Sequence, residues 1–145
     1  MESSVFETIV VGADESATAA EAVRQAIELA KLTGGQLHVV SAYRHEHFSG
    51  TDSSETAGAL GTRDLAESVV ADHVSRARAA GLAAEGHSRS GDAANAICDV
   101  ATEVSADLIV VGNKGMTGAK RFLLGSVPNK VSHHAPCSVL IIRTT

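Results

Sequence analysis

Three glycines in the last third of the chain have the type and spacing that suit a phosphate-binding loop. An apolar run at 108–111 ends in Gly112; Gly115 follows after two residues, and Gly125 with Ser126 follows after nine more. A short apolar run bounded by glycine predicts a strand that is buried on both faces. Glycines let backbone N–H groups approach an anion, and a helix N-terminus favours negative charge. The stretch therefore predicts a phosphate site where a strand ends and a helix begins.

The residues after Gly125 predict the start of that helix. Pro128 fits the first turn, where a missing N–H costs little, so Ser126 or Val127 is expected to be the N-cap. The Ser126 hydroxyl could also reach a phosphate, although helix capping alone would explain a serine at this place. The site and the helix start thus share the same few residues.

Charge is divided unevenly along the chain. The sequence holds 12 Lys+Arg and 17 Asp+Glu, and all 17 acids lie in residues 1–107. Residues 108–145 carry only basic charge, from Lys114, Lys120, Arg121, Lys130 and Arg143. The acidic chain therefore keeps acid away from the segment in which the anion is expected. Lys114 and Lys120 are natural counter-charges for phosphate, and solvated loop lysines are the alternative interpretation.

A second stretch with polar chemistry is Ala13 and Asp14, which follow the strand expected at 8–12 and its last residue, Gly12. An ionised carboxylate is an acceptor only, and a ribose offers two donor hydroxyls, so Asp14 suits the sugar of a nucleotide. Asp14 could instead hold Mg²⁺ or simply complement the dipole of a following helix. The backbone of residues 41–43, at the end of another strand, could hydrogen-bond a base.

The elements that must position these residues alternate between strands and helices. Strands are expected at 8–12, 37–43, 83–88, 108–111 and 138–143. Helices are expected from Ser16 to about Thr33, up to Gly81, from Asp92 onward, and up to about His134. The first two are marked by apolar residues at helical spacing, Ala19, Val23, Ala26, Ile27 and Ala30, then Leu65, Val69, Val70, Val74 and Ala77. The third is expected to face inward with Ile97, Val100, Ala101 and Val104. This alternation predicts an α/β fold, a five-stranded parallel sheet with helices on both faces.

The order of the strands decides where a ligand would bind. Strands 8–12 and 108–111 are the most hydrophobic and are therefore expected at the centre, with 83–88 at an edge. Ligands of such sheets bind outside the carboxyl ends of the strands, where the strand order reverses. Gly12, Ala13 and Asp14 should consequently meet Gly112 and Asn113 in one crevice.

Composition limits the class of protein. The 145 residues fit one domain, 1–145, that buries about two-thirds of its unfolded surface. The acidic net charge argues against a nucleic-acid partner, and no apolar run approaches the ~20 residues of a membrane span. Cys98 and Cys137 form no C-x-x-C motif and are expected to be buried free thiols. With no signal peptide in view, we expect a cytoplasmic protein.

A catalytic function and a metal site are the alternatives to nucleotide binding. The chain has no G-x4-G-K-[ST] loop and no G-x-S-x-G elbow, so no catalytic residue is assigned and ATP hydrolysis, if any, is expected to be slow. His45 and His47 could join His133 and His134 in a zinc site, but no pair has i, i+4 spacing, so no metal is assigned. Segment 44–61, rich in Ser, Thr, Gly, His and acid, is too long for an ordinary connection and has no assigned role.

Gly-x2-Gly-x9-Gly-Ser, preceded by Leu-Ile-Val-Val and followed by Val-Pro and Val-Leu-Ile-Ile, resembles the motif of the universal stress protein family. The opening Ile-Val-Val-Gly-Ala-Asp-Glu-Ser and the Ser-Gly-Asp at 90–92 are similar too, so the resemblance spans nearly the whole chain. It implies a Rossmann-like, adenine nucleotide alpha hydrolase-like fold and a homodimer that pairs through the C-terminal strand. Family members with this motif typically bind ATP.

The resemblance also implies roles for particular residues. Asp14, beside Gly12 and Ala13, would hold the ribose, and the backbone of Ala42 would meet adenine. The phosphates, with or without Mg²⁺, would be cradled by Gly112, Asn113, Lys114, Gly115, Gly125, Ser126 and Val127. Similar actinobacterial proteins are associated with cyclic AMP (cAMP) instead, and an interaction module without a ligand is a third reading. We therefore expect a nucleotide-binding stress-response sensor or regulator.

Overall fold

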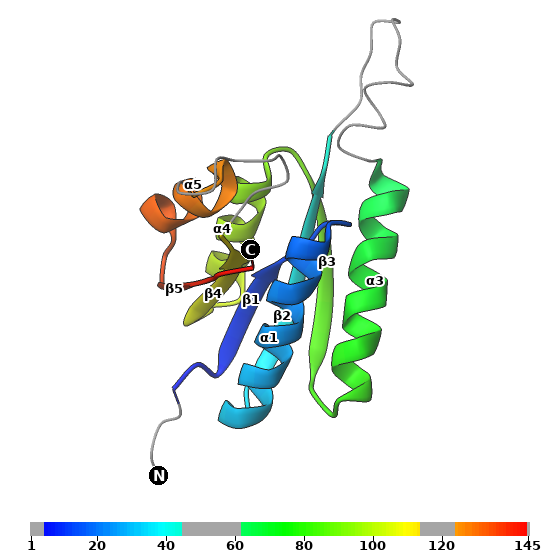
Figure 1. Cartoon of the computed structure of the whole chain (residues 1–145), viewed down its shortest axis with the longest axis vertical. Coiled ribbons are helices and arrows are strands. Elements are labelled where there is room, and N and C mark those ends of the chain that lie inside the picture. Colours follow the sequence, from blue (N-terminus) through cyan, green and yellow to red (C-terminus); the bar gives the residue numbers. More distant parts are fainter. Residues whose placement is uncertain (1–4, 45–61, 114–123, 145) are drawn as a thin grey trace, which may run out of the picture.

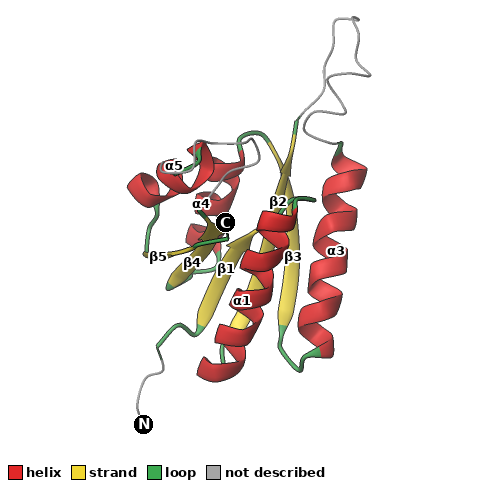
Figure 2. Cartoon of the chain, viewed as in Figure 1, coloured by secondary structure: helices red, strands yellow, loops and turns green. Residues whose placement is uncertain are grey.

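The computed structural model describes residues 5–44, 62–113 and 124–144, which form a parallel sheet with helices on both faces (Figures 1 and 2). The strands are β1 (Thr8–Gly12), β2 (Gln36–Tyr43), β3 (Ala84–Ser90), β4 (Leu108–Gly112) and β5 (Ser138–Ile142). The helices are α1 (Ala17–Thr33), α3 (Arg63–Ala79), α4 (Ala93–Glu103) and α5 (Ser126–His134). Within these ranges, no helix is long and apolar enough to cross a membrane.

The strand order is β3-β2-β1-β4-β5, with every neighbouring pair parallel. The chain moves outward from β1 to β3 and then returns to place β4 on the other side of β1. The strand order therefore reverses between β1 and β4, as the sequence predicts. The weakly apolar strand β3 lies at one edge, which confirms that expectation, and β5 forms the other edge.

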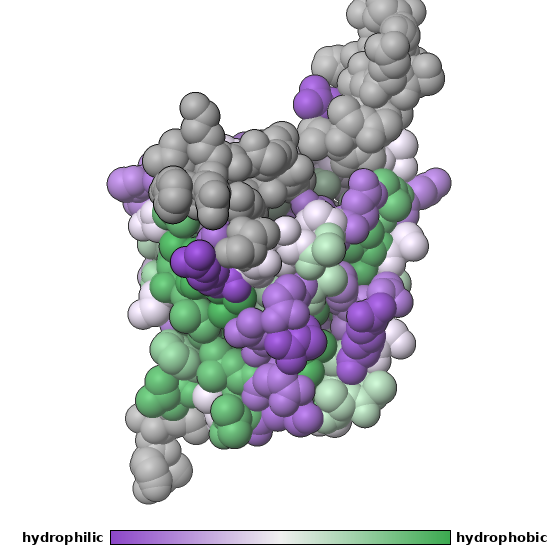
Figure 3. Space-filling model, viewed as in Figure 1, coloured by the Kyte–Doolittle hydropathy of each residue, from purple (hydrophilic) through white to green (hydrophobic). Residues whose placement is uncertain are grey.

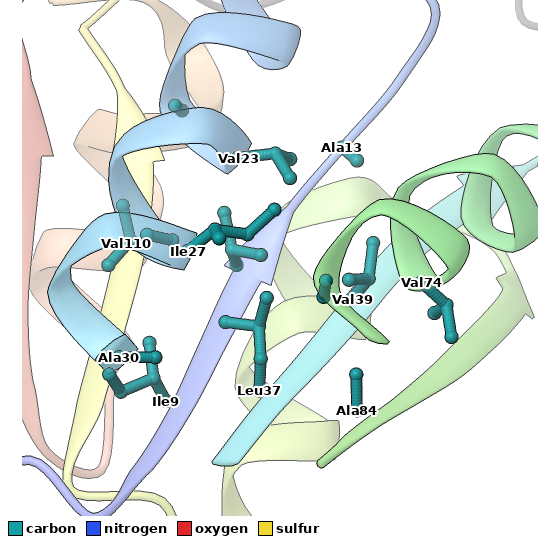
Figure 4. Close-up of a cluster of buried hydrophobic side chains, with 14 of the residues drawn as sticks. Ile9, Ala13, Val23, Ile27, Ala30, Leu37, Val39, Val74, Ala84 and Val110 are labelled. Carbon is teal, nitrogen blue, oxygen red and sulfur yellow. The ribbon is translucent and has the colours of Figure 1, made fainter. Parts of the chain in front are cut away.

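Two hydrophobic clusters fill the space between the sheet and its two helical layers. Ile9, Val11, Leu37 and Val39 point to one face, where they pack against α1 and α3 (Figure 4). Val10 and Val40 are among the side chains that point to the other face, towards α4 and α5. Because successive side chains of a strand alternate between faces, a strand covered on both sides must be apolar throughout. This is why β1 and β4 read as continuous apolar runs.

Three of the helices begin at capping residues that the sequence makes recognisable. The Ser16 hydroxyl accepts a hydrogen bond from the N–H of Ala19 at 3.1 Å, and α1 ends at Gly34 in the left-handed conformation with φ 76°. Thr62 caps α3, and the Asp92 carboxylate caps α4 by accepting from the N–H of Asn95 at 2.9 Å. Each such bond satisfies an N–H that has no partner inside its helix.

The predicted cap of α5 is wrong. Gly125 is the N-cap, with an extended backbone and no side-chain cap bond, and Ser126 is the first residue of the helix. Pro128 then occupies the third helical position, which is still within the turn whose N–H groups lack intrahelical partners. The proline therefore marks the first turn but does not fix the cap to a single residue.

The expectation for helix α3 also needs one correction, because Leu65 is 38% exposed and does not face the core. Ala66 and His73 are buried in its place. The helix packs very closely on the edge strand: a Cβ added at Gly86 would lie 2.1 Å from Cγ1 of Val70. The contact face is thus centred on Val70 and Val74, and Leu65 in the first turn lies outside it.

Asp107 joins the beginnings of the two central strands. Its carboxylate accepts hydrogen bonds from the N–H groups of Glu7 at 2.9 Å and Thr8 at 3.0 Å. The N–H of Asp107 in turn donates to the carbonyl of Thr8 at 3.0 Å. A single residue thereby holds the entry to β4 in register with the entry to β1.

Candidate functional site

A cleft opens at the carboxyl ends of β1 and β4, at the point where the strand order reverses. It contains about 490 Å³ of empty space, its open mouth included. The lining residues are Gly12, Ala13, Asp14, Ser16, Thr18, Ala19, Val40, Ala42, Ala93, Ile97, Val111, Gly112, Val127 and Pro128. Six of the eleven predicted site residues are in this list, so the two sequence stretches do converge. A largely apolar cleft with few polar groups is typical of small-molecule sites.

The second strand extends beyond the first at this end of the sheet. Strand β1 pairs with β2 only as far as Gly12 with Val40, whereas β3 pairs with β2 as far as Tyr43. The N–H of Ala13 makes the last bond on the β1 side, to the carbonyl of Val40 at 2.8 Å. Ala42 consequently borders the cleft on the side that β1 has left, where a planar ring could lie against the strand edge.

Two glycines at the floor of the cleft allow neighbouring side chains to pack closely against the strand ends. A Cβ added at Gly12 would lie 2.6 Å from Cδ1 of Ile97, and one at Gly112 would lie 3.1 Å from Cγ2 of Thr18. Glycine at position 12 therefore allows α4 to approach the end of β1. Glycine at position 112 likewise allows Thr18 of α1 to lie against the end of β4.

Asp14 lies half-buried at the rim of the cleft, in the turn between β1 and α1. Its Oδ1 accepts hydrogen bonds from the backbone N–H of Ser16 at 2.7 Å and from the Ser16 hydroxyl at 2.5 Å. Within the described chain, its Oδ2 accepts no hydrogen bond. One carboxylate oxygen thus fixes the side chain, and the other is left as an acceptor for a ligand hydroxyl.

The phosphate part of the predicted site is only partly described. Lys114 and Gly115 lie outside the described residues. Asn113 uses its side chain inside the protein, since its Oδ1 accepts from the N–H and the hydroxyl of Thr144, both at 2.9 Å. Gly125 donates its N–H to the carbonyl of Asn113 at 3.0 Å, which closes the loop between β4 and α5. Gly125 is buried, whereas Ser126 is exposed and does not line the cleft.

Lys130 contributes less free positive charge than its position in the basic segment suggests. Its Nζ lies 3.2 Å from Oδ2 of Asp92. The N–H of Asn95 and, to a smaller degree, this ammonium group lower the pKa of the Asp92 carboxyl. In the folded chain, the carboxylate of Asp92, the N-cap of α4, therefore lies next to the segment that has no acidic residue of its own.

The sequence interpretation missed the lining residues that come from the N-terminal parts of helices. Thr18 and Ala19 belong to α1, Ala93 and Ile97 to α4, and Pro128 to α5. In a parallel sheet every helix that follows a strand begins near the carboxyl end of that strand. Their positions could have been deduced from the predicted helix starts alone.

The order β3-β2-β1-β4-β5 is that of a doubly wound α/β architecture, the adenine nucleotide alpha hydrolase-like fold. The chain belongs to the universal stress protein family, because the sequence model of that family matches residues 6–143.

Individual relatives agree with this membership. A universal stress protein of Mycobacterium tuberculosis is 37% identical over 147 residues, which cover 98% of this chain and 99% of the relative. Among solved structures, a universal stress protein in complex with cAMP is 31% identical, covers 98% of this chain and 100% of its own, and superposes with a TM-score of 0.73. The universal stress protein of Archaeoglobus fulgidus in complex with dAMP is 27% identical, covers 96% and 99%, and has a TM-score of 0.68.

Proposed function

We propose that this protein binds an adenine nucleotide, ATP in first place, in the cleft between β1 and β4 and acts as a stress-response sensor or regulator. The base would lie against Ala42, the ribose would donate a hydroxyl to Asp14, and the phosphates would extend towards Gly112 and Gly125. The observation that carries the proposal is the position of the Asp14 carboxylate at the rim of an apolar cleft that is floored by glycine.

The arrangement of polar groups favours binding over catalysis. Within the described part of the cleft, Asp14 is the acidic residue, and its Oδ1 is already occupied by Ser16. Phosphoryl transfer relies on positioned cations and on a group that orients the nucleophile. A bound nucleotide would therefore change the stability and shape of the protein, with hydrolysis slow or absent.

Cyclic AMP is the second candidate, and one observation favours it. The cAMP complex is 31% identical to this chain and covers nearly all of both chains. A cyclic monophosphate would need only the part of the cleft near Gly112, whereas a triphosphate would need the whole glycine motif as far as Ser126.

Calorimetric titration of the purified protein with ATP–Mg²⁺, cAMP and AMP, in separate experiments, tests the proposal. Tighter binding of ATP would support the triphosphate site, and tighter binding of cAMP would make the protein a second-messenger sensor or buffer. If none of the three binds, the nucleotide proposal is wrong and an interaction module without a ligand takes its place. Rapid multiple-turnover hydrolysis would contradict the sensor role.

The proposal includes a homodimer that forms through β5. This strand is a sheet edge, its backbone pairs with β4 on one side only, and Leu140 is 39% exposed. Figure 3 shows hydrophobic atoms gathered over the side of the molecule where β4 and β5 lie, next to the hydrophilic outer face of α1. An apolar edge strand is a template for pairing with another chain. A cytoplasmic location, expected from the sequence, completes the proposal.

A further inference from the structure

Three side chains with metal-binding atoms converge at the β2–β3 edge of the sheet, outside the nucleotide cleft. Nδ1 of His38 lies 3.0 Å from Nε2 of His87 and 3.9 Å from Oε1 of Glu85. One ligand atom from each of the three residues lies within 4.8 Å of the other two. The metal candidates that the sequence suggests are histidines 45, 47, 133 and 134; this group is not among them, because His38 is far from Glu85 and His87 in the sequence.

The sheet itself brings the group together. Glu85 and His87 are two residues apart on β3, so their side chains point to the same face. His38 on β2 is in register with Glu85, and Val40, two residues later, is in register with His87. All three therefore project from two paired strands, on the face that α4 covers. Groups carried by strands are held more precisely than groups carried by loops.

The distances are close to those of a metal site. In a tetrahedral zinc site with Zn–N near 2.0–2.1 Å, neighbouring ligand atoms are about 3.3–3.4 Å apart. The histidine nitrogens, at 3.0 Å, would need to separate by only a few tenths of an ångström. Glu85 would need to approach, and its side chain is 67% exposed and can change rotamer.

Burial makes the two imidazoles suitable ligands. His38 is only 4% exposed, and His87 is half-buried. Burial lowers the pKa of both rings, and the proximity of His38 lowers that of His87 further, whereas Glu85 raises both. A neutral imidazole is the form that binds metal. Without a metal, one ring must donate an N–H hydrogen bond to the nitrogen of the other. A metal ion would instead accept the lone pairs of both nitrogens.

We propose that His38, Glu85 and His87 form a binding site for a divalent transition-metal ion, with Zn²⁺ as the best match. Two imidazoles and one carboxylate are ligands that zinc commonly takes, and three protein ligands leave a fourth position for water. The carboxylate also balances part of the charge of the ion. A calcium or magnesium ion would instead require mainly oxygen ligands.

Zinc titration of the full-length protein, without a histidine tag and after dialysis against a chelator, tests the proposal. We expect one Zn²⁺ per chain, measured by competition with a fluorescent chelator. Glu85→Gln removes a ligand charge from an exposed side chain, and His87→Gln removes a ring that is half-buried. Each should weaken binding by at least about 10-fold, the effect of losing even an outer-shell partner. Circular dichroism checks that both variants are folded. If His87→Gln is not folded, the zinc affinity of Glu85→Gln alone decides the test.

Control variants separate this site from the other candidate ligands in the chain. The double variant His45→Gln/His47→Gln and the single variant His134→Gln should bind zinc with unchanged affinity. Cobalt substitution supplies a spectroscopic readout, since nitrogen and oxygen ligands give no thiolate charge-transfer band and Cys98 or Cys137 would. The proposal is overturned if the wild-type protein binds no zinc, if Glu85→Gln binds like wild type, or if affinity is lost in a control variant.

Discussion

Replacing Asp14 by asparagine tests the central contact of the proposed nucleotide site with very little change in shape. In the structure, Oδ1 accepts both hydrogen bonds from Ser16, and Oδ2 is left for a ligand. The asparagine side chain can keep its oxygen on the Ser16 N–H. Its amide nitrogen then occupies the position of Oδ2 and presents a donor to the ribose hydroxyl, which is also a donor.

The size of the effect follows from the bond that is lost. A hydrogen bond to a charged group contributes about 1.5–3 kcal/mol, which corresponds to about 10- to 100-fold in affinity. Because the bond to the Ser16 N–H survives, we expect the free energy of unfolding to change by less than about 1 kcal/mol. Asp14→Asn should thus lose nucleotide affinity and keep its free energy of unfolding almost unchanged.

Titration calorimetry with the nucleotide that binds wild type best, together with thermal unfolding of the unliganded protein, measures both quantities. Glu15→Gln is the matched control, because it removes a neighbouring carboxylate charge whose side chain is exposed and does not line the cleft. If Asp14→Asn and Glu15→Gln bind the nucleotide equally well, Asp14 only braces the turn before α1, and the assignment of the ribose contact is wrong.

Three further predictions concern the loop, the edge strand and a buried ring. Gly125→Ala should fold normally, because the backbone angles of Gly125, φ −66° and ψ 170°, suit alanine. Calorimetry should nevertheless show weaker nucleotide binding, because the new Cβ would block the approach of an anion to the backbone. Unchanged affinity would mean that Gly125 is not part of the site. If the proposed dimer forms through β5, Leu140→Lys should convert it to a monomer in light scattering, whereas Leu32→Lys, at an 84% exposed position on α1, should leave it a dimer. His73→Leu should raise the free energy of unfolding by about 1 kcal/mol, since Nδ1 of His73 is buried without a partner among the described residues. Burial lowers the pKa of this ring, so wild type should lose stability as the pH falls below about 6.5, and urea denaturation above and below that pH should show a smaller loss in the variant.

Much of the fold could be predicted from the sequence because local signals agree with the final structure. The runs at 9–11 and 108–111 are apolar at every position, as a strand covered on both faces requires. Ser16, Gly34 and Asp92 are residue types that end or begin helices, and the structure uses them in that way. The convergence of Gly12 and Gly112 then followed from a rule of parallel sheets, without knowledge of any side-chain contact.

The errors occurred where packing between elements decides the outcome. Leu65 fits the helical periodicity of α3, but the close contact between Val70 and Gly86 sets which side of the helix faces the sheet. The ion pair of Lys130 with Asp92 joins α5 to α4, and no local pattern indicates it. The cluster of His38, Glu85 and His87 depends on the register of β2 with β3, and a shift of one residue would separate it.

The bonds made by Asp107 have a consequence for the folding of the chain. They join residues that are 99 and 100 positions apart, whereas β1 and β2 come together over a much shorter loop that contains only α1. Non-local pairing of this kind costs more loop entropy and slows folding. We therefore expect the segment from β1 to β3, with α1 and α3, to assemble before β4 docks against β1. The cleft between β1 and β4 would then be among the last parts to form, so a nucleotide bound there would stabilise the completed molecule and slow the detachment of its C-terminal part, from β4 onward.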